Sequence, residues 1–199
     1  MLNENVILEM LDTKFVQLTD VWTYSPNTDR ARWDGNYDRV DSETRPTYRS
    51  ASFDLRLNDG NALDLTAESV GIYVIRDDIS MIYIGKTEKH IGQRFNAHIS
   101  KFTAVRRHDH PKRWRDYARS RLQAKGSKFE VLDEFEMSFY DFSDFEAVLK
   151  GPTIKEQVED MEALIFYGLC VTNPKERFLN TEGRVGTRES REKWKAFFG

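Results

Sequence analysis

The sequence has little cysteine and no long apolar run, and each shortage excludes a class of protein. Cys170 is the single cysteine among 199 residues, which excludes an internal disulfide and a cysteine-based zinc site. The longest stretch without a charged side chain, residues 163–174, is far shorter than the roughly 18 residues of a membrane-spanning helix. Glu4, Glu9 and Asp12 interrupt the first apolar positions, which argues against a secretory signal. We therefore expect a soluble protein of the reducing cytoplasm.

Aromatic residues, in contrast, are plentiful. The chain holds 13 Phe, eight Tyr and four Trp, enough large rings to build a packed core. A disordered chain is poor in such residues, so the composition predicts a folded protein. The length suits one domain with an additional arm.

Charge is distributed unevenly along the chain. The formal net charge is only -3, yet residues 86–128 carry 13 basic and three acidic side chains, a net charge of +10. Residues 129–163 carry the reverse, with two basic and 11 acidic side chains. A basic block inside an acidic protein is typical of a face that binds a polyanion such as nucleic acid, although a solvated helical face has the same composition.

The order of predicted elements favours an α+β fold with a small three-stranded antiparallel sheet flanked by helices. Two β-branched and aromatic runs predict a strand pair, and apolar spacing predicts the helices that follow. Strands are expected at 71–75, 81–85 and 129–135, and helices at 91–104, 112–124, 142–149 and 153–169. Before them we expect a helix within 1–20, an irregular segment over 24–49 and a hairpin over 53–65.

One carboxylate stands out in the last of these helices, which begins with a Thr153–Glu156 capping box. Stepping about 100° per residue places Glu162 inside the apolar stripe that contains Val158 and Met161. A buried carboxylate needs a metal ion, an arginine or several hydrogen bonds as compensation. The pattern leaves these alternatives open, together with a place at the edge of the stripe.

The helix at 91–104 carries a polar row of similar interest. Arg94, His98 and Lys101 are four and three residues apart and so share one helical face. An arginine fork can clamp phosphate oxygens, and a nearby histidine can move a proton near neutral pH. A plain basic surface row would have the same spacing.

Together these pieces resemble the GIY-YIG nuclease family. The signature reads Gly71-Ile72-Tyr73, then nine residues, then Tyr83-Ile84-Gly85-Lys86. Arg94, His98, Glu162 and Asn180 follow in the family's order, so the resemblance covers about residues 70–182. The interval of 18 residues between Glu162 and Asn180 is longer than usual, which leaves Asn173 as a competitor for the family asparagine. The Arg-xxx-His pairing looks more like homing and restriction members than excision-repair members.

The resemblance implies phosphodiester hydrolysis with one divalent metal ion. Glu162 would bind a single Mg²⁺ or Mn²⁺, and Arg94 would hold the phosphoryl oxygens. Tyr73 would activate the water with help from the charge of Lys86 or His98, or His98 would take the proton itself. The remaining implied catalytic residues are Tyr83, which would orient the phosphate or water, and Asn180.

The resemblance further implies a DNA endonuclease, restriction-like or from a mobile element. A DNA repair or processing nuclease is the alternative, and a catalytically silent nucleic-acid-binding module of the same fold is the rival from another class. Residues 70–199 would form the nuclease-like domain, with 1–69 as an N-terminal extension that packs on it. A homodimer and a companion methyltransferase remain open. The expected contacts to the DNA backbone are Lys101, Arg106, Arg107, Lys112, Arg113, Arg115 and Arg119.

Overall fold

A computed structural model provides the coordinates of the chain. The structure describes residues 3–26, 53–58, 63, 65, 69–78, 81–88, 91, 94, 133–146, 149, 151–173, 178 and 187–198. Within these residues, no helix has both the length and the apolar character needed to cross a bilayer.

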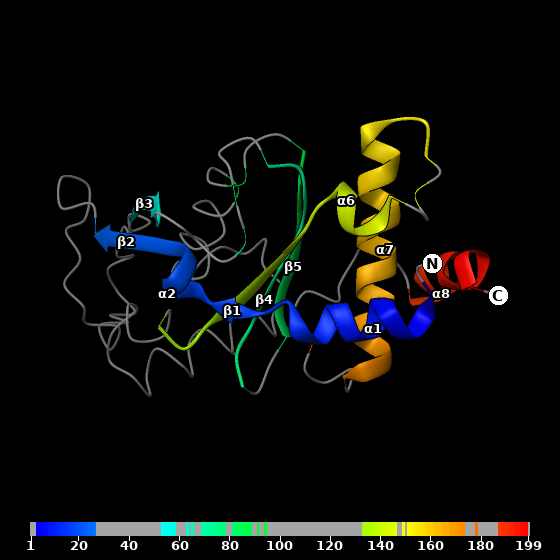
Figure 1. Ribbon diagram of the computed structural model, residues 1–199, viewed down its shortest axis with the longest axis horizontal. Helices are drawn as coiled ribbons and strands as arrows, with labels where there is room; N and C mark the ends of the chain where they lie inside the picture. The colour runs from blue at the N-terminus through cyan, green and yellow to red at the C-terminus, as the bar shows by residue number, and fades with distance from the viewer. Residues whose placement is uncertain are drawn as a thin grey trace, which may run out of the picture.

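A four-stranded antiparallel sheet forms the centre of the described fold, in the order β1-β6-β4-β5 (Figure 1). Its strands are β1 (Val16–Gln17), β4 (Gly71–Arg76), β5 (Met81–Thr87) and β6 (Glu136–Tyr140). Strand β4 lies in the interior of the sheet, and its first five residues are all buried. β5 is an edge strand of this sheet, so its residues are reached without crossing another described strand.

The described helices lie mainly on one side of this sheet. Figure 1 shows α1, α6, α7 and α8 together on that side, with β2, β3 and α2 at the opposite end of the view. Bounds are Glu4–Thr13 for α1, Leu18–Val21 for α2, Phe142–Phe145 for α6, Ile154–Thr172 for α7 and Thr187–Phe198 for α8. The smaller sheet pairs β2 (Trp22–Pro26) with β3 (Phe53–Leu57).

The core lies between the sheet and α7. Ile72 and Val74 of β4 and Ile84 of β5 point to the same side, opposite the buried Val158 and Met161 of α7. Burying such apolar side chains is the main source of stability for the domain. The core therefore fixes α7 against the β4–β5 pair.

The N-terminal helix belongs to the same core. Ile7 and Leu11 of α1 are fully buried in it, and Trp194 of α8 donates a hydrogen bond of 3.0 Å to Glu4. A Cβ atom on Gly168 of α7 would come 3.2 Å from the Trp194 ring, so the glycine allows α1, α7 and α8 to approach closely.

The α+β class, the antiparallel sheet and the flanking helices confirm the sequence-based prediction. The capping box of Thr153 and Glu156 is also present at the start of α7. Among the described residues, the sheet has a fourth strand that the sequence did not predict, β1, which pairs Val16 with Met137. A strand of two residues is too short to give a hydrophobic pattern.

Two strand predictions were wrong in detail. β3 pairs with β2, many residues earlier, rather than forming a hairpin over 53–65. The third predicted strand lies later, at β6 instead of 129–135, where residues 133 and 134 form a turn. β6 contains Glu136 and Ser138, which hide its strand character; Glu136 is held by an ion pair of 2.6 Å with Arg76 on β4.

Candidate active site

Two tyrosines and a glycine meet on one face of the β4–β5 pair. Tyr73 lies opposite Gly85 in the register, and Ile75 lies opposite Tyr83. Because side chains alternate between faces along a strand, Tyr73, Tyr83 and Gly85 share one face. The two tyrosine rings stack with their centroids 5.9 Å apart and their planes 27° from parallel.

Gly85 provides the space that the two rings occupy. A Cβ atom added at this position would come 2.6 Å from the hydroxyl oxygen of Tyr73 and would also collide with the ring of Tyr83. Any other residue at this position therefore forces at least one tyrosine to move. The fold therefore requires a residue without a Cβ atom at position 85, beside the two tyrosine rings.

The phenol of Tyr73 is held in its neutral form. The residue is fully buried, and this burial raises the pKa of its hydroxyl well above the ordinary value of 10.0. Neighbouring Tyr83 raises that pKa further, whereas the positive charge of Arg94 lowers it. Of the cations that the structure describes, Arg94 is therefore the one that favours ionisation of Tyr73.

A second group of charged residues lies on the other face of β5. Lys86 follows Gly85 directly and so points to the face that packs against α7. Its ammonium nitrogen lies 3.7 Å from Oε2 of Glu162 and 3.9 Å from Oε1 of Glu159. The side chains of Lys86 and Glu162 are only 20% and 18% exposed, while that of Glu159 is 42% exposed.

The helical geometry of α7 explains why these carboxylates meet Lys86. Glu159 and Glu162 are three residues apart and lie on one face of the helix. Asp160 turns to a different side, where its carboxylate forms an ion pair of 2.6 Å with Lys193 of α8. Glu162 is bordered by the buried Met161 and Ala163, which agrees with its predicted place within the apolar stripe.

Positions 85 and 86 of the edge strand β5 are adjacent in the chain but belong to opposite faces, one in each group. Gly85 faces the tyrosines, and Lys86 faces the carboxylates of α7.

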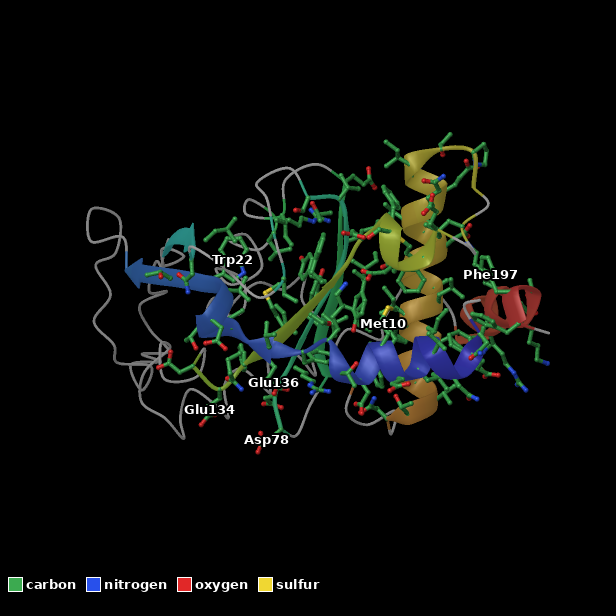
Figure 2. All side chains as sticks on the ribbon, viewed as in Figure 1. Met10, Trp22, Asp78, Glu134, Glu136 and Phe197 are labelled. Atoms are coloured by element: carbon green, nitrogen blue, oxygen red, sulfur yellow. The ribbon has the colours of Figure 1, made fainter. Side chains whose placement is uncertain are left out.

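Figure 2 shows Asp78, Glu134 and Glu136 toward the lower left of the view, away from α7. Asp78 lies in the connection between β4 and β5, whereas Gly71 and Thr87 pair at the other end of these strands. The acidic side chains are thus at the opposite end from Lys86.

The predicted site residues fall into two sets with respect to the structure. Tyr73 and Tyr83 stack on one face of the β4–β5 pair, where the charge of Arg94 lowers the pKa of Tyr73, and Lys86 and Glu162 are paired on the other face. The Arg94 side chain is exposed, and residues 91 and 94 are helical, as predicted. The remaining predicted residues lie outside the described part of the chain: His98, Asn180, Lys101, Arg106, Arg107, Lys112, Arg113, Arg115 and Arg119.

Asn173, the competitor for the family asparagine, ends helix α7. Its backbone N–H donates to the Leu169 carbonyl over 2.9 Å, and its side-chain amide donates to the same carbonyl over 3.0 Å. These bonds satisfy a backbone oxygen that the end of the helix would otherwise leave unpaired.

Sequence reasoning missed Glu159 as a partner of Lys86. The available signal was its spacing of three residues from Glu162, which places both carboxylates on one helical face. The contact with Lys86 depends on how α7 packs against β5, which the spacing alone does not give.

The residues present fit a weakly held divalent cation. No three His, Cys, Asp or Glu side chains gather into a metal-binding group within the described residues. Mg²⁺, however, is commonly bound by one or two carboxylates, with waters and substrate phosphate completing the coordination. The half-buried carboxylate of Glu162 provides a hard oxygen ligand of this kind.

Comparison with known proteins identifies one family. Residues 69–152 match the model of the GIY-YIG catalytic domain. The matched segment contains Tyr73, Tyr83, Gly85, Lys86 and Arg94 and ends just before α7. No curated protein and no solved structure matches the chain.

Proposed function

The chain belongs to the GIY-YIG family of nucleases through residues 69–152, and on this premise we propose that it is a metal-dependent DNA endonuclease. It hydrolyses a phosphodiester bond and leaves a 5′-phosphate. The observation that carries the proposal is the stacked Tyr73–Tyr83 pair over Gly85. The charge of Arg94 lowers the pKa of Tyr73. Lys86, the residue after Gly85, forms an ion pair with Glu162 on the other face of β5.

Arg94 binds the phosphoryl oxygens in this proposal. Its planar guanidinium offers two parallel N–H donors that match a phosphate, and its exposed side chain is accessible to a polymer substrate. Because the same charge favours ionisation of Tyr73, bound phosphate would partly neutralise Arg94 and keep the phenol protonated.

Tyr73 therefore acts as a hydrogen-bond donor that orients the attacking water or the phosphate. Its raised pKa makes it a poor proton acceptor near neutral pH. The proton of the water passes instead to His98, four residues after Arg94, because imidazole is the side chain best suited to accept a proton at neutral pH. Tyr83 fixes the ring of Tyr73 by stacking, and Asn180 keeps its family role as a further site residue.

Glu162 would hold the divalent ion, Mg²⁺ or Mn²⁺, with waters and the substrate phosphate as the other ligands. When bound, the ion supplies positive charge that stabilises the phosphoryl group and the leaving 3′ oxygen. Lys86 places a second positive charge beside the Glu162 carboxylate.

DNA reaches the site from the end of the β4–β5 pair that carries Lys86. Acidic side chains at the opposite end, including Asp78, repel the phosphate backbone from that end. The block at 86–128, with its net charge of +10, supplies the backbone contacts. The Arg-xxx-His spacing of residues 94 and 98 favours a restriction-like or mobile-element role.

Plasmid cleavage tests the proposal. Supercoiled plasmid incubated with the protein and Mg²⁺ should be nicked or linearised, and EDTA should abolish the reaction. Binding measured without metal should weaken steeply as salt rises, because phosphate contacts release counterions. A protein that binds DNA but cuts none with Mg²⁺ or Mn²⁺ at any pH between 6 and 9 would instead be the silent binding module.

A further inference from the structure

Glu159 is a residue to which neither the family resemblance nor the proposed chemistry gives a role. Its carboxylate nevertheless lies within 3.9 Å of the Lys86 ammonium, almost as close as Glu162 at 3.7 Å. Both distances exceed the 2.7–2.9 Å typical of a charge-assisted hydrogen bond. The ammonium therefore lies between the two carboxylates without a close hydrogen bond to either.

This arrangement matters because Lys86 opposes cation binding by Glu162. An ammonium group 3.7 Å from the carboxylate neutralises part of its charge and competes with any metal ion for its oxygens. The competition is strongest when Glu162 is the only counterion of Lys86. A second carboxylate beside the ammonium weakens this competition, because the ammonium can pair with it instead of with Glu162.

We propose that Glu159 is a positioning residue that draws Lys86 away from Glu162 when the divalent ion binds, an inference that rests on the proposed function. The geometry suits this role, since Glu159 and Glu162 are one turn apart on α7 and flank the same nitrogen. Glu159 is also the more exposed of the two, so its pairing with Lys86 costs less desolvation.

The role differs from that of a second metal ligand. If Glu159 acts through Lys86, its removal weakens metal binding only while Lys86 is present. If Glu159 binds the ion directly, its removal weakens metal binding whether or not Lys86 is present. A double-mutant cycle separates the two, because it measures the coupling between the two side chains.

The experiment measures Mn²⁺ binding to the full chain by calorimetry, without DNA, so the readout is independent of cleavage. Glu159→Gln should weaken binding by about three- to ten-fold, as expected for the loss of one partly exposed charge interaction. Glu159→Asp keeps the charge and should stay within about two-fold of the wild type. Lys86→Met should tighten binding because Glu162 loses its competing cation, and adding Glu159→Gln to it should have little further effect.

Glu9→Gln on α1 is the control, since it removes an exposed carboxylate of equal charge from another helix. Thermal unfolding checks the fold of each variant, and Lys86→Gln replaces Lys86→Met if the latter does not fold. An unchanged affinity in Glu159→Gln, or an equal loss with and without Lys86, would overturn the inference while plasmid cleavage by the wild type keeps the proposed function. A wild type that neither binds Mn²⁺ nor cuts DNA would overturn both.

Discussion

The rings of Tyr73 and Tyr83 stack with centroids 5.9 Å apart, and Gly85 on the paired strand leaves the space for both. The two tyrosines are on different strands, so their contact depends on the register of β4 with β5. A shift of one residue in that register would move one ring to the opposite face. The register of the two strands therefore brings these signature residues into contact.

Replacing Gly85 with alanine tests this steric relationship. The added methyl group collides with both rings, so Gly85→Ala should lose about 1–3 kcal/mol of unfolding free energy and most of its cleavage activity. Urea unfolding and plasmid cleavage at a temperature where the variant stays folded measure the two effects.

Gly168→Ala is the matched control for that variant. Its methyl group would crowd Leu11 and Trp194 in the core, away from the tyrosines. It should lose stability but keep its cleavage rate when folded. Equal loss of cleavage in both glycine variants would mean that the activity follows stability alone.

The burial of Tyr73 predicts a loss of stability at high pH. Its pKa is raised in the folded state, so the unfolded chain loses the proton first as the pH rises above about 10. The stabilising effect is fully present below that pH and is lost between it and the folded-state pKa, by about 1.4 kcal/mol per pH unit for each such group. Tyr140, whose pKa is also raised by burial, adds to the same loss.

Tyr73→Phe should reduce the slope of unfolding free energy against pH over the range 10 to 11.5. Chemical unfolding at several pH values measures that slope, with Tyr140→Phe as a comparison that should reduce it similarly. A slope that is identical in the wild type and in Tyr73→Phe would show that the Tyr73 hydroxyl ionises as easily in the folded protein as in the unfolded chain.

The ion pair between α7 and α8 should contribute to stability without taking part in catalysis. Lys193 and Asp160 are 2.6 Å apart and mostly shielded from solvent, so Asp160→Asn should cost about 1 kcal/mol of unfolding free energy. Because Asp160 is two residues from Glu162 on another side of α7, cleavage by the folded variant should change less than about two-fold. A large loss of cleavage would mean that this ion pair fixes the position of Glu162.

The core contacts of α1 predict that the N-terminal region is needed for folding. Leu11 is fully buried against α7 and α8, so Leu11→Ala should cost about 2–5 kcal/mol. Exposed Val6 on the same helix is the control, and Val6→Ala should cost far less. A Leu11→Ala variant as stable as the wild type would show that α1 is dispensable for folding.

The sequence alone predicts features that depend on local spacing. The capping box at Thr153, the place of Glu162 in an apolar stripe and the strand pair around Tyr73 all follow from periods of 3.6 or two residues. Features that depend on distant contacts were missed. The pairing of β2 with β3 and the position of Lys86 between Glu159 and Glu162 arise only when the chain folds back on itself.

The cation that affects the pKa of Tyr73 likewise depends on contacts that sequence spacing does not give. The signature left Lys86 and His98 as the sources of positive charge, but alternation along β5 turns Lys86 toward α7. Among the described residues, Arg94 is the cation that lowers the pKa of the phenol, and His98 lies outside them. Tyr73 pairs with Gly85, one position from Lys86, and alternation along the strands places the two side chains on opposite faces.

Cleavage by Glu162→Gln tests the central claim most directly. The amide keeps the size of the side chain but removes the charge that would hold a divalent ion, so plasmid cleavage in Mg²⁺ should fall by at least about 100-fold. DNA binding and the unfolding midpoint should stay close to those of the wild type. A variant that cuts plasmid at the wild-type rate would contradict the claim that this carboxylate, paired with Lys86, belongs to the active site of the nuclease.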